Sequence, residues 1–435
     1  MKETIHIKKI GINGEGIGYK NKKVVFVPGA LPEEKVSVDV SNEGKSYSTG
    51  KLLDVLTPNP KRVKPTCANY PQCLGCSLLH VEYKETLLYK KDAIVETFSK
   101  YTGFKNIDKI VDDVVGKEKL DGFINSVSLP IVGFNKKITF GIYQRGSKYL
   151  TIMNDCMKYS PIIKKTLNDL AKVLNDNKCR DYNDHFKTGL RFVMLRSVGD
   201  EVQIVFITGT DGVNDKVVED ITKLGYVSSI FMSVNTSSRQ DFKESGYTKL
   251  WGNSKAAYVY DDKKYIYSIK TSLPEDDESF DKVTKIVQNE LKDSNKIIAL
   301  YDNLGIISLS SKKEMVSILD NKGAYNDAVS NKKFLKCDNV DFVIGKVSEK
   351  VVLYAKRKIY DTFYLDLTDH FISDKLKETL RYSNAKKVVI LASQPYGIAK
   401  DIHDLQKYFK LTSIKGIDTK PYTSNVSVIL VLERK

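Results

Sequence analysis

Residues 65–83 read Pro-Thr-Cys-Ala-Asn-Tyr-Pro-Gln-Cys-Leu-Gly-Cys-Ser-Leu-Leu-His-Val-Glu-Tyr and include Cys67, Cys73 and Cys76 in a C-x5-C-x2-C spacing. Nothing at the amino end resembles a signal peptide, so we expect a cytoplasmic protein with reduced thiols. Cysteines grouped in this way bind metal more often than they form disulfides. Thiolates favour zinc or iron–sulfur clusters, and both require a fourth ligand.

Length and charge set the next limits. A chain of 435 residues is too long for one hydrophobic core and predicts about two to four domains. Lys and Arg number 69 against 54 Asp and Glu, which gives a net charge of +15. This excess favours a polyanionic partner, usually nucleic acid, although a lysine-rich composition can also follow from genomic base bias. The longest apolar runs, at 388–392 and 426–432, are too short to span a membrane.

The residues before the cysteines form one predicted unit. Short β-rich runs alternate with glycine-containing turns up to about Pro60, which predicts a small closed OB-like or SH3-like barrel over residues 1–60. The segment Gly14-Glu15-Gly16-Ile17-Gly18 is not interpreted as a dinucleotide-binding loop, because no helix follows it. We expect a β-turn within the barrel instead.

The residues after the cysteines predict two larger units. Residues 81–101 have apolar side chains at helical spacing. Strands and helices follow up to 273, with one strand expected over 133–144, which predicts an α+β central domain over 61–273. Beyond the acidic segment Pro274–Glu278, strands such as 314–319 and 362–367 alternate with helices such as 374–382, and the last predicted elements form a hairpin of 411–418 and 425–433. This alternation predicts a doubly wound, Rossmann-like α/β domain over 274–435.

The order of these parts resembles a known family. Residues 10–19 and 24–32 are similar to the TRAM domain, an RNA-binding barrel, and the cysteine stretch with Leu79, His80 and Tyr83 matches an iron–sulfur motif. Further matching segments follow in the family's order: 133–137, 141–143, 155–156, 190–191 and 250–252. The whole chain thus resembles the bacterial S-adenosylmethionine (SAM)-dependent RNA uracil-C5 (5-methyluridine) methyltransferases, especially those that act on 23S ribosomal RNA.

The resemblance supplies a fourth ligand for the metal site. Cys156 stands at the position of the family's fourth cysteine, so Cys67, Cys73, Cys76 and Cys156 would hold a [4Fe–4S] cluster. Zinc is the alternative, since His80 could complete a Cys3His site without Cys156. Cys179 and Cys337 remain and need no special role.

The catalytic positions depart from the family pattern. The family uses a cysteine to add to C6 of uracil and a glutamate to remove the C5 proton. Here the segment Ile390–Pro395 places Ser393 at the nucleophile position, and residues 418–428 place Ser427 at the base position. A serine hydroxyl is barely ionised at neutral pH and is a poor substitute for either group.

The SAM positions are altered as well. The family's glycine-rich loop is replaced by Ala299-Leu-Tyr-Asp-Asn-Leu-Gly305, in which only Gly305 is kept. Glu275 aligns with a glutamine that precedes the domain, and Asp366 is all that remains of an Asp-Pro-Pro-Arg segment. The acidic residue expected to bind the ribose falls near Leu319, with Asp320 one position away.

Two hypotheses follow from this contrast. The first is a monomeric RNA-binding protein that contacts 23S ribosomal RNA and whose methyltransferase-like domain has lost its chemistry. The second is an active methyltransferase with a different nucleophile, for which Cys337 is the available thiol in the last domain. A redox-sensing module built on the cluster is a third hypothesis that rests on the cysteines alone.

Overall fold

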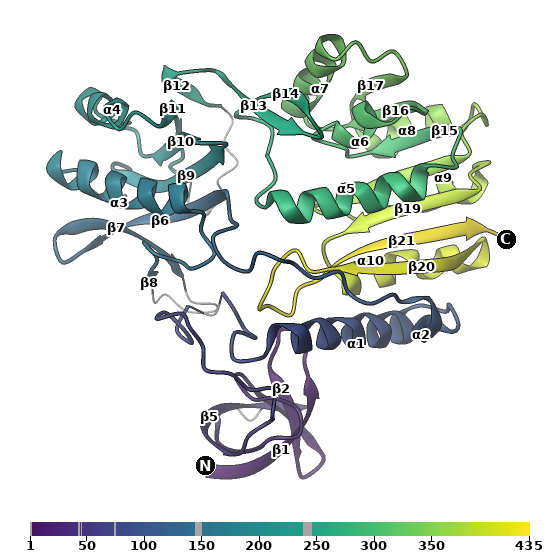
Figure 1. Ribbon diagram of the computed structural model, residues 1–435, viewed down its shortest axis with the longest axis horizontal. Helices are drawn as coiled ribbons and strands as arrows, with labels where there is room; N and C mark the ends of the chain where they lie inside the picture. Colours follow the sequence, from purple (N-terminus) through teal and green to yellow (C-terminus); the bar gives the residue numbers. More distant parts are fainter. Residues whose placement is uncertain (1, 42–43, 45, 74, 144–149, 238–245) are drawn as a thin grey trace.

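The computed structural model describes residues 2–435 apart from 42–43, 45, 74, 144–149 and 238–245 (Figure 1). It contains a small barrel at the amino end and two larger sheets. Among the described residues, no helix is both long and apolar enough to cross a membrane.

The amino-terminal barrel is confirmed. Its strands close in the order β1-β2-β3-β5-β4 around a core of Ile and Val side chains. Their bounds are β1 Lys2–Ile10, β2 Gly16–Lys20, β3 Lys23–Val27, β4 Lys35–Ser41 and β5 Tyr47–Thr57. Gly14 lies in the turn between β1 and β2 with a φ of 87°, a conformation that favours glycine. The segment 14–18 is therefore a turn and a strand start, as expected.

The central domain contains a seven-stranded sheet in the order β12-β11-β10-β9-β6-β7-β8. The bounds are β6 Ser126–Phe134, β7 Lys137–Tyr143, β8 Leu150–Ile152, β9 Leu190–Val198, β10 Glu201–Thr208, β11 Val227–Val234 and β12 Thr248–Gly252. Helices α3 (Pro161–Asp176) and α4 (Asp215–Thr222) pack against this sheet and share its core. One difference from expectation lies at 133–144, predicted as a single strand. Asn135 and Lys136 adopt positive φ there and form a two-residue turn between β6 and β7.

The carboxy-terminal sheet has the order β17-β16-β15-β18-β19-β21-β20. Neighbouring strands from β17 to β19 are parallel, and β21 is antiparallel to both β19 and β20, so the doubly wound α/β prediction and the final hairpin are confirmed. The strand bounds are β15 Lys296–Leu300, β16 Glu314–Leu319, β17 Val340–Ile344, β18 Thr362–Leu367, β19 Lys387–Ala392, β20 Phe409–Ile417 and β21 Ser427–Arg434. The helix bounds are α5 Asp277–Leu291, α6 Ile306–Ser310, α7 Lys322–Phe334, α8 Val347–Ala355, α9 Asp374–Tyr382 and α10 Pro395–Ile402, followed by the 3-10 helix η1 His403–Lys407.

Two segments from the region 61–273 pack on the carboxy-terminal sheet. Helix α1 (Tyr83–Tyr101) and the short helix α2 (Ile107–Ile110) contribute Ile94, Phe98 and Ile107 to the same hydrophobic core as β18 and β19. The hairpin of β13 (Lys255–Tyr260) and β14 (Lys263–Ser268) packs tyrosines into the core on the sheet's other face. Along the chain, the central sheet thus lies between segments that pack on the carboxy-terminal sheet. We therefore propose that the expected domains, 61–273 and 274–435, divide the chain in sequence order and do not coincide with the units that pack together.

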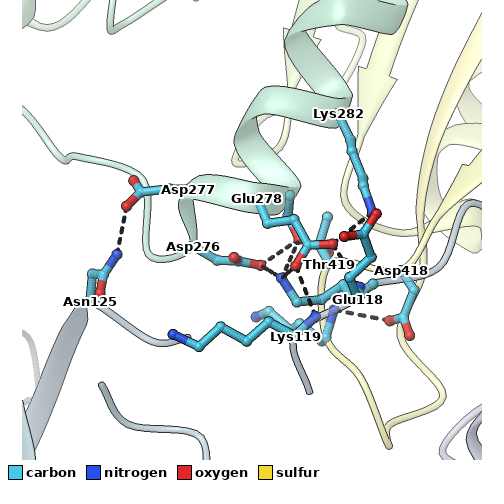
Figure 2. A network of polar contacts seen from close by, with 12 residues as sticks. Glu118, Lys119, Asn125, Asp276, Asp277, Glu278, Lys282, Asp418 and Thr419 are labelled. Carbon is cyan, nitrogen blue, oxygen red and sulfur yellow. Dashed lines mark hydrogen bonds and ion pairs between the residues drawn. The ribbon is translucent and has the colours of Figure 1, made fainter. Parts of the chain in front are cut away.

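The acidic segment before α5 joins the two larger units (Figure 2). Asp276 accepts a hydrogen bond from the buried Lys117 ammonium at 2.5 Å, and Asp277 accepts one from Asn125 at 2.9 Å. Glu278 accepts from the backbone N–H groups of Glu118 and Lys119. These carboxylates therefore hold residues 117–125 against the start of α5, and the segment is a packed junction and not a free linker.

Candidate functional site

The carboxyl ends of β15 and β18 mark the centre of the candidate site. Strand order reverses between these two neighbours, and ligands of open α/β sheets bind in the crevice at such a point. The loop after β15 comprises residues 301–305, and the loop after β18 begins at Thr368. The first loop contains Gly305 and the second closely follows Asp366, two positions that the resemblance assigns to SAM binding.

The loop after β15 satisfies its polar groups internally. Asp302 is buried, and its Oδ2 accepts hydrogen bonds from the Ser308 N–H at 2.8 Å and from Ser308 Oγ at 2.7 Å. Burial raises the pKa of the Asp302 carboxyl above its usual range. Gly305 has a φ of 69°, and a Cβ added there would meet protein atoms, the nearest being Ala328 Cβ at 3.4 Å. Backbone conformation therefore explains Gly305 without a ligand.

An aromatic stack bridges the two loops. The rings of Tyr301 and His370 lie with centroids 3.8 Å apart and an interplanar angle of 16°. Tyr301 adopts a φ of 64°, which is uncommon for a residue with a Cβ and costs on the order of 1 kcal/mol or more. A ligand lying between these loops would have to displace the stack. Sequence analysis missed His370, because no motif links it to Tyr301.

The remaining SAM positions do not complete a binding site. Glu275 is exposed before α5, and the contact it makes is through its carbonyl, which accepts from the Asn125 N–H at 2.7 Å. Asp320 directly follows β16, where an acidic residue could face a ribose. Since Asp302 is bonded inward and the Tyr301–His370 stack spans the crevice, the residues present do not fit SAM.

Asp366 lies near the end of β18 beside the same crevice. Its Oδ1 accepts from the Thr368 Oγ1 at 2.8 Å and from the Thr368 N–H at 3.2 Å. Burial raises the pKa of Asp366 to about 7, and the negative charges of Asp302 and Asp369 add to this effect although the Thr368 bonds oppose it. The carboxyl of Asp366 is therefore about half protonated at neutral pH in the folded protein.

Replacement of Asp366 by Asn is expected to make stability less dependent on pH. The folded pKa lies above the unfolded value, so the carboxyl favours folding fully below pH about 4 and loses that contribution as pH rises through about 7. The variant should gain about 1 kcal/mol or more over the parent between pH 5 and pH 8, measured by urea unfolding. A constant difference across this range would contradict the assignment.

Ser393 lies in a small pocket at the carboxyl ends of β18 and β19. The pocket has a volume of about 190 Å³ and is lined by the loop after β18, by Gln394 and by the first turns of α10. Ser393 Oγ donates a hydrogen bond to the Thr368 carbonyl at 2.7 Å, and the structure gives it no other partner among the described residues. Asp369, His370 and Asp401 line the same pocket, but among the described residues Ser393 Oγ makes no hydrogen bond to a histidine or a carboxylate.

Ser427 begins β21, next to β19. Ala392 and Val428 are paired across these antiparallel strands. Ser393 follows Ala392 and Ser427 precedes Val428, so the two serines lie next to this pair on the same side. The Ser427 Oγ is 3.0 Å from Thr419 Oγ1, and the residue is buried. The fold thus brings the two predicted catalytic positions close together, but with two hydroxyls in place of a nucleophile and a base.

The four expected metal ligands come from two segments. Cys67, Cys73 and Cys76 lie in the irregular segment before α1, and Cys156 lies in the loop after β8. Burial raises the pKa of Cys73, with smaller contributions from Cys76 and Cys67. Burial likewise raises the pKa of Cys156, with contributions from Cys76 and Cys73. Each of the four thiols is therefore within electrostatic reach of another.

The described thiols are not arranged to coordinate a single metal ion. Within the described part of the chain, no three His, Cys, Asp or Glu side chains are grouped so as to hold one metal ion. Sulfurs bound to one zinc lie within about 4 Å of each other, given Zn–S bonds of about 2.3 Å. An all-thiol donor set fits an iron–sulfur cluster chemically, so the cluster remains a proposal.

His80, the alternative zinc ligand, is buried beside the barrel. Its Nδ1 is 2.7 Å from Tyr70 Oη, and its Nε2 is buried with no hydrogen-bond partner among the described residues. Burial lowers the pKa of His80 to about 4, with a further contribution from the charge of Arg62. The ring is therefore neutral, and its hydrogen bond is with a phenol rather than with a thiol.

A loop connects the cysteines to the α/β domain through contacts that sequence analysis did not predict. Residues 418–426, called here the junction loop, link β20 to β21. Its Tyr422 carbonyl accepts from the Leu78 N–H at 2.9 Å, and its Pro421 carbonyl accepts from Lys158 Nζ at 2.7 Å. Ser424 Oγ donates to the Ile12 carbonyl of the barrel at 2.8 Å. The junction loop therefore touches the barrel, the cysteine segment and the central domain.

The comparisons with known proteins cover the whole chain. Residues 2–53 match the TRAM domain model. A protein of Streptococcus agalactiae named as an uncharacterized RNA methyltransferase is 25% identical over 99% of this chain and 98% of its own length. Relatives with the same description from Enterococcus faecalis and Bacillus cereus are each 27% identical over 99% of this chain, covering 97% and 96% of their own lengths.

Among solved structures, the Pyrococcus abyssi tRNA (uracil-54, C5)-methyltransferase in complex with S-adenosyl-L-homocysteine superimposes with a TM-score of 0.78. It is 20% identical and is matched over 99% of this chain and 100% of its own. At this identity the likeness establishes the fold. The TRAM domain model, the full-length relatives named as RNA methyltransferases and the shared fold agree that this chain is similar to RNA methyltransferases along its whole length.

Proposed function

We propose that this protein binds RNA, with 23S ribosomal RNA as its target, and does not transfer a methyl group from SAM. It acts in the cytoplasm as a monomer. The observation that carries the proposal is the crevice between β15 and β18, where the Tyr301–His370 stack joins the two loops and the buried Asp302 is bonded to Ser308 rather than directed toward a ligand.

The chemistry at Ser393 supports the same conclusion. Addition to C6 of uracil requires an ionised or activated nucleophile, and a serine needs an adjacent base to provide one. Ser393 instead donates a hydrogen bond to the Thr368 carbonyl, and the nearby Ser427 contacts the hydroxyl of Thr419. A neutral hydroxyl is a poor base for the C5 proton, so neither predicted catalytic position carries the group that the family's reaction uses.

The alternative nucleophile, Cys337, lies at the wrong edge of the sheet. It follows α7 and comes just before β17, which places it at the amino ends of the strands. Its Sγ contacts the Leu309 carbonyl at 3.5 Å, at the end of α6. Ser393 lies at the opposite, carboxyl edge, so no observation on the described residues favours an active enzyme that uses Cys337.

Cys67, Cys73, Cys76 and Cys156 would hold the proposed cluster, and the cluster would cross-link the two segments that carry them. It would tie the irregular segment before α1 to the loop after β8. Both segments contact the junction loop, through Leu78 and Lys158. Cluster formation would therefore stabilise the arrangement of barrel, central domain and α/β domain that presents a continuous surface to RNA.

Two titrations of the purified holoprotein test the proposal. Calorimetry with SAM up to high micromolar concentration should give no binding heat. Fragments of 23S ribosomal RNA should bind with an affinity that falls steeply as salt rises, because phosphate contacts release counterions. Saturable SAM binding would contradict the loss of the cofactor, and salt-insensitive or absent RNA binding would remove the proposed function itself.

A further inference from the structure

A cluster of two lysines and two tyrosines lies on the surface formed by α1 and α10. Tyr101 and Tyr396 pack edge to face with centroids 4.9 Å apart. The Lys400 ammonium lies 4.2 Å from the centre of the Tyr396 ring and 5.5 Å from that of Tyr101, and the Lys100 ammonium lies 5.0 Å from the centre of the Tyr101 ring. Lys400 also donates a hydrogen bond to Tyr396 Oη. We call these four residues the Lys–Tyr patch.

The Lys–Tyr patch is accessible and positively charged. Tyr396 is 41% exposed, and both lysines are exposed. Among the described residues, neither Lys100 nor Lys400 has a carboxylate within ion-pair distance, although many surface lysines of this chain do. Glu96, one helical turn before Lys100, is bonded to Lys9 at 2.6 Å. The positive charge of the patch is thus not neutralised by a paired acid.

The patch lies between the barrel and the Ser393 pocket. The Lys9–Glu96 ion pair joins the end of β1 to α1, one turn from Lys100. Figure 1 shows α1 between the barrel and α10. On the other side, Tyr396 stands between Gln394 and Gly397, which line the pocket, while Tyr396 itself is not among the lining residues. A strand that runs from the barrel to the pocket would therefore pass over this surface.

We propose that the Lys–Tyr patch binds single-stranded RNA, with a base on Tyr396 and phosphates on Lys100 and Lys400. Aromatic faces stack on any base, and lysines without a paired acid bind the backbone, which is the combination used for single strands. This inference rests on the proposed RNA-binding function and adds a surface that connects the barrel to the pocket.

The test compares variants of the full-length holoprotein in binding a fluorescent single-stranded 20-mer of uridine, followed by anisotropy. Tyr396→Ala should weaken binding about 5- to 100-fold, the usual loss for one stacked base, while Tyr396→Phe keeps the ring and should bind like the parent. Tyr382→Ala is the matched control, since this tyrosine is also exposed but lies on α9.

The lysines are tested through salt dependence. Each phosphate bound by a single strand contributes about 0.7 to the slope of log affinity against log salt, so the double variant Lys100→Gln/Lys400→Gln should reduce that slope by about 1.4. Lys263→Gln/Lys264→Gln changes net charge equally on the exposed start of β14 and should leave the slope unchanged. Parent-like binding by Tyr396→Ala and by the Lys100/Lys400 variant would overturn the patch and leave the proposed function standing. Failure of the parent to bind RNA would overturn both.

Discussion

Replacement of Lys90 by Met is expected to lower the free energy of unfolding by about 3 to 5 kcal/mol. Lys90 lies on α1 and Asp418 begins the junction loop; their side chains are 1% and 0% exposed and 2.5 Å apart. Burial lowers the pKa of Lys90, and the Asp418 charge opposes this shift. Removing the ammonium leaves an unpaired carboxylate in a buried site, which is the costly half of a buried ion pair.

The consequence extends beyond one contact because Lys90 also donates to the Lys420 carbonyl at 3.3 Å. Without Lys90, the junction loop loses this attachment to α1. Lys91→Met is the matched control: Lys91 pairs with Asp113, whose side chain is 91% exposed, and such pairs contribute little. Urea unfolding of both variants and of Lys90→Met/Asp418→Asn measures the effect. Equal stability of Lys90→Met and Lys91→Met would contradict a structural role for the pair.

Replacement of Cys156 by Ala is expected to remove most of the iron bound by the purified protein and to lower its thermal stability. Cys156 is the proposed ligand that comes from the central domain, so its loss would leave the other three thiols with an incomplete site. Iron and sulfide analysis, visible absorbance and thermal unfolding provide the measurements.

Cys179→Ala is the control for Cys156. Both thiols are partly buried against the same hydrophobic core of the central domain, so the packing effects of the two substitutions are comparable. Only the Cys156 variant should lose iron. Unchanged iron in that variant would remove it from the ligand set, and zinc that disappears in His80→Ala would replace the cluster with a Cys3His site.

Most helices and strands of the fold could be predicted because the spacing of their apolar residues differs between a helix and a strand. Strands Glu314–Leu319 and Thr362–Leu367 and helix Asp374–Tyr382 have the predicted bounds, since their apolar residues follow the period of a strand or a helix. The placement of α1 could not be predicted. Its apolar face requires a partner, but periodicity does not say that this partner is a sheet about 200 residues further along the chain, roughly the span of one domain.

The site was predictable where chemistry depends on residue type and not where it depends on conformation. The prediction that Ser393 and Ser427 stand at the nucleophile and base positions rests on the resemblance and on residue type, and the Ala392–Val428 pairing places the two serines beside each other. The Tyr301–His370 stack depends on a positive φ at Tyr301 and on the meeting of two loops. Neither leaves a signal in one sequence, just as Lys90 and Asp418 give no local sign that they form a buried pair.

The most direct test is a methyl-transfer assay on RNA that is demonstrably bound. The holoprotein would be saturated with 23S ribosomal RNA fragments at low salt, with binding followed by anisotropy, and then incubated with radiolabelled SAM. We expect saturable RNA binding with no incorporation of label above a protein-free control. Incorporation approaching one methyl group per bound RNA would contradict the central claim that this protein binds RNA without modifying it.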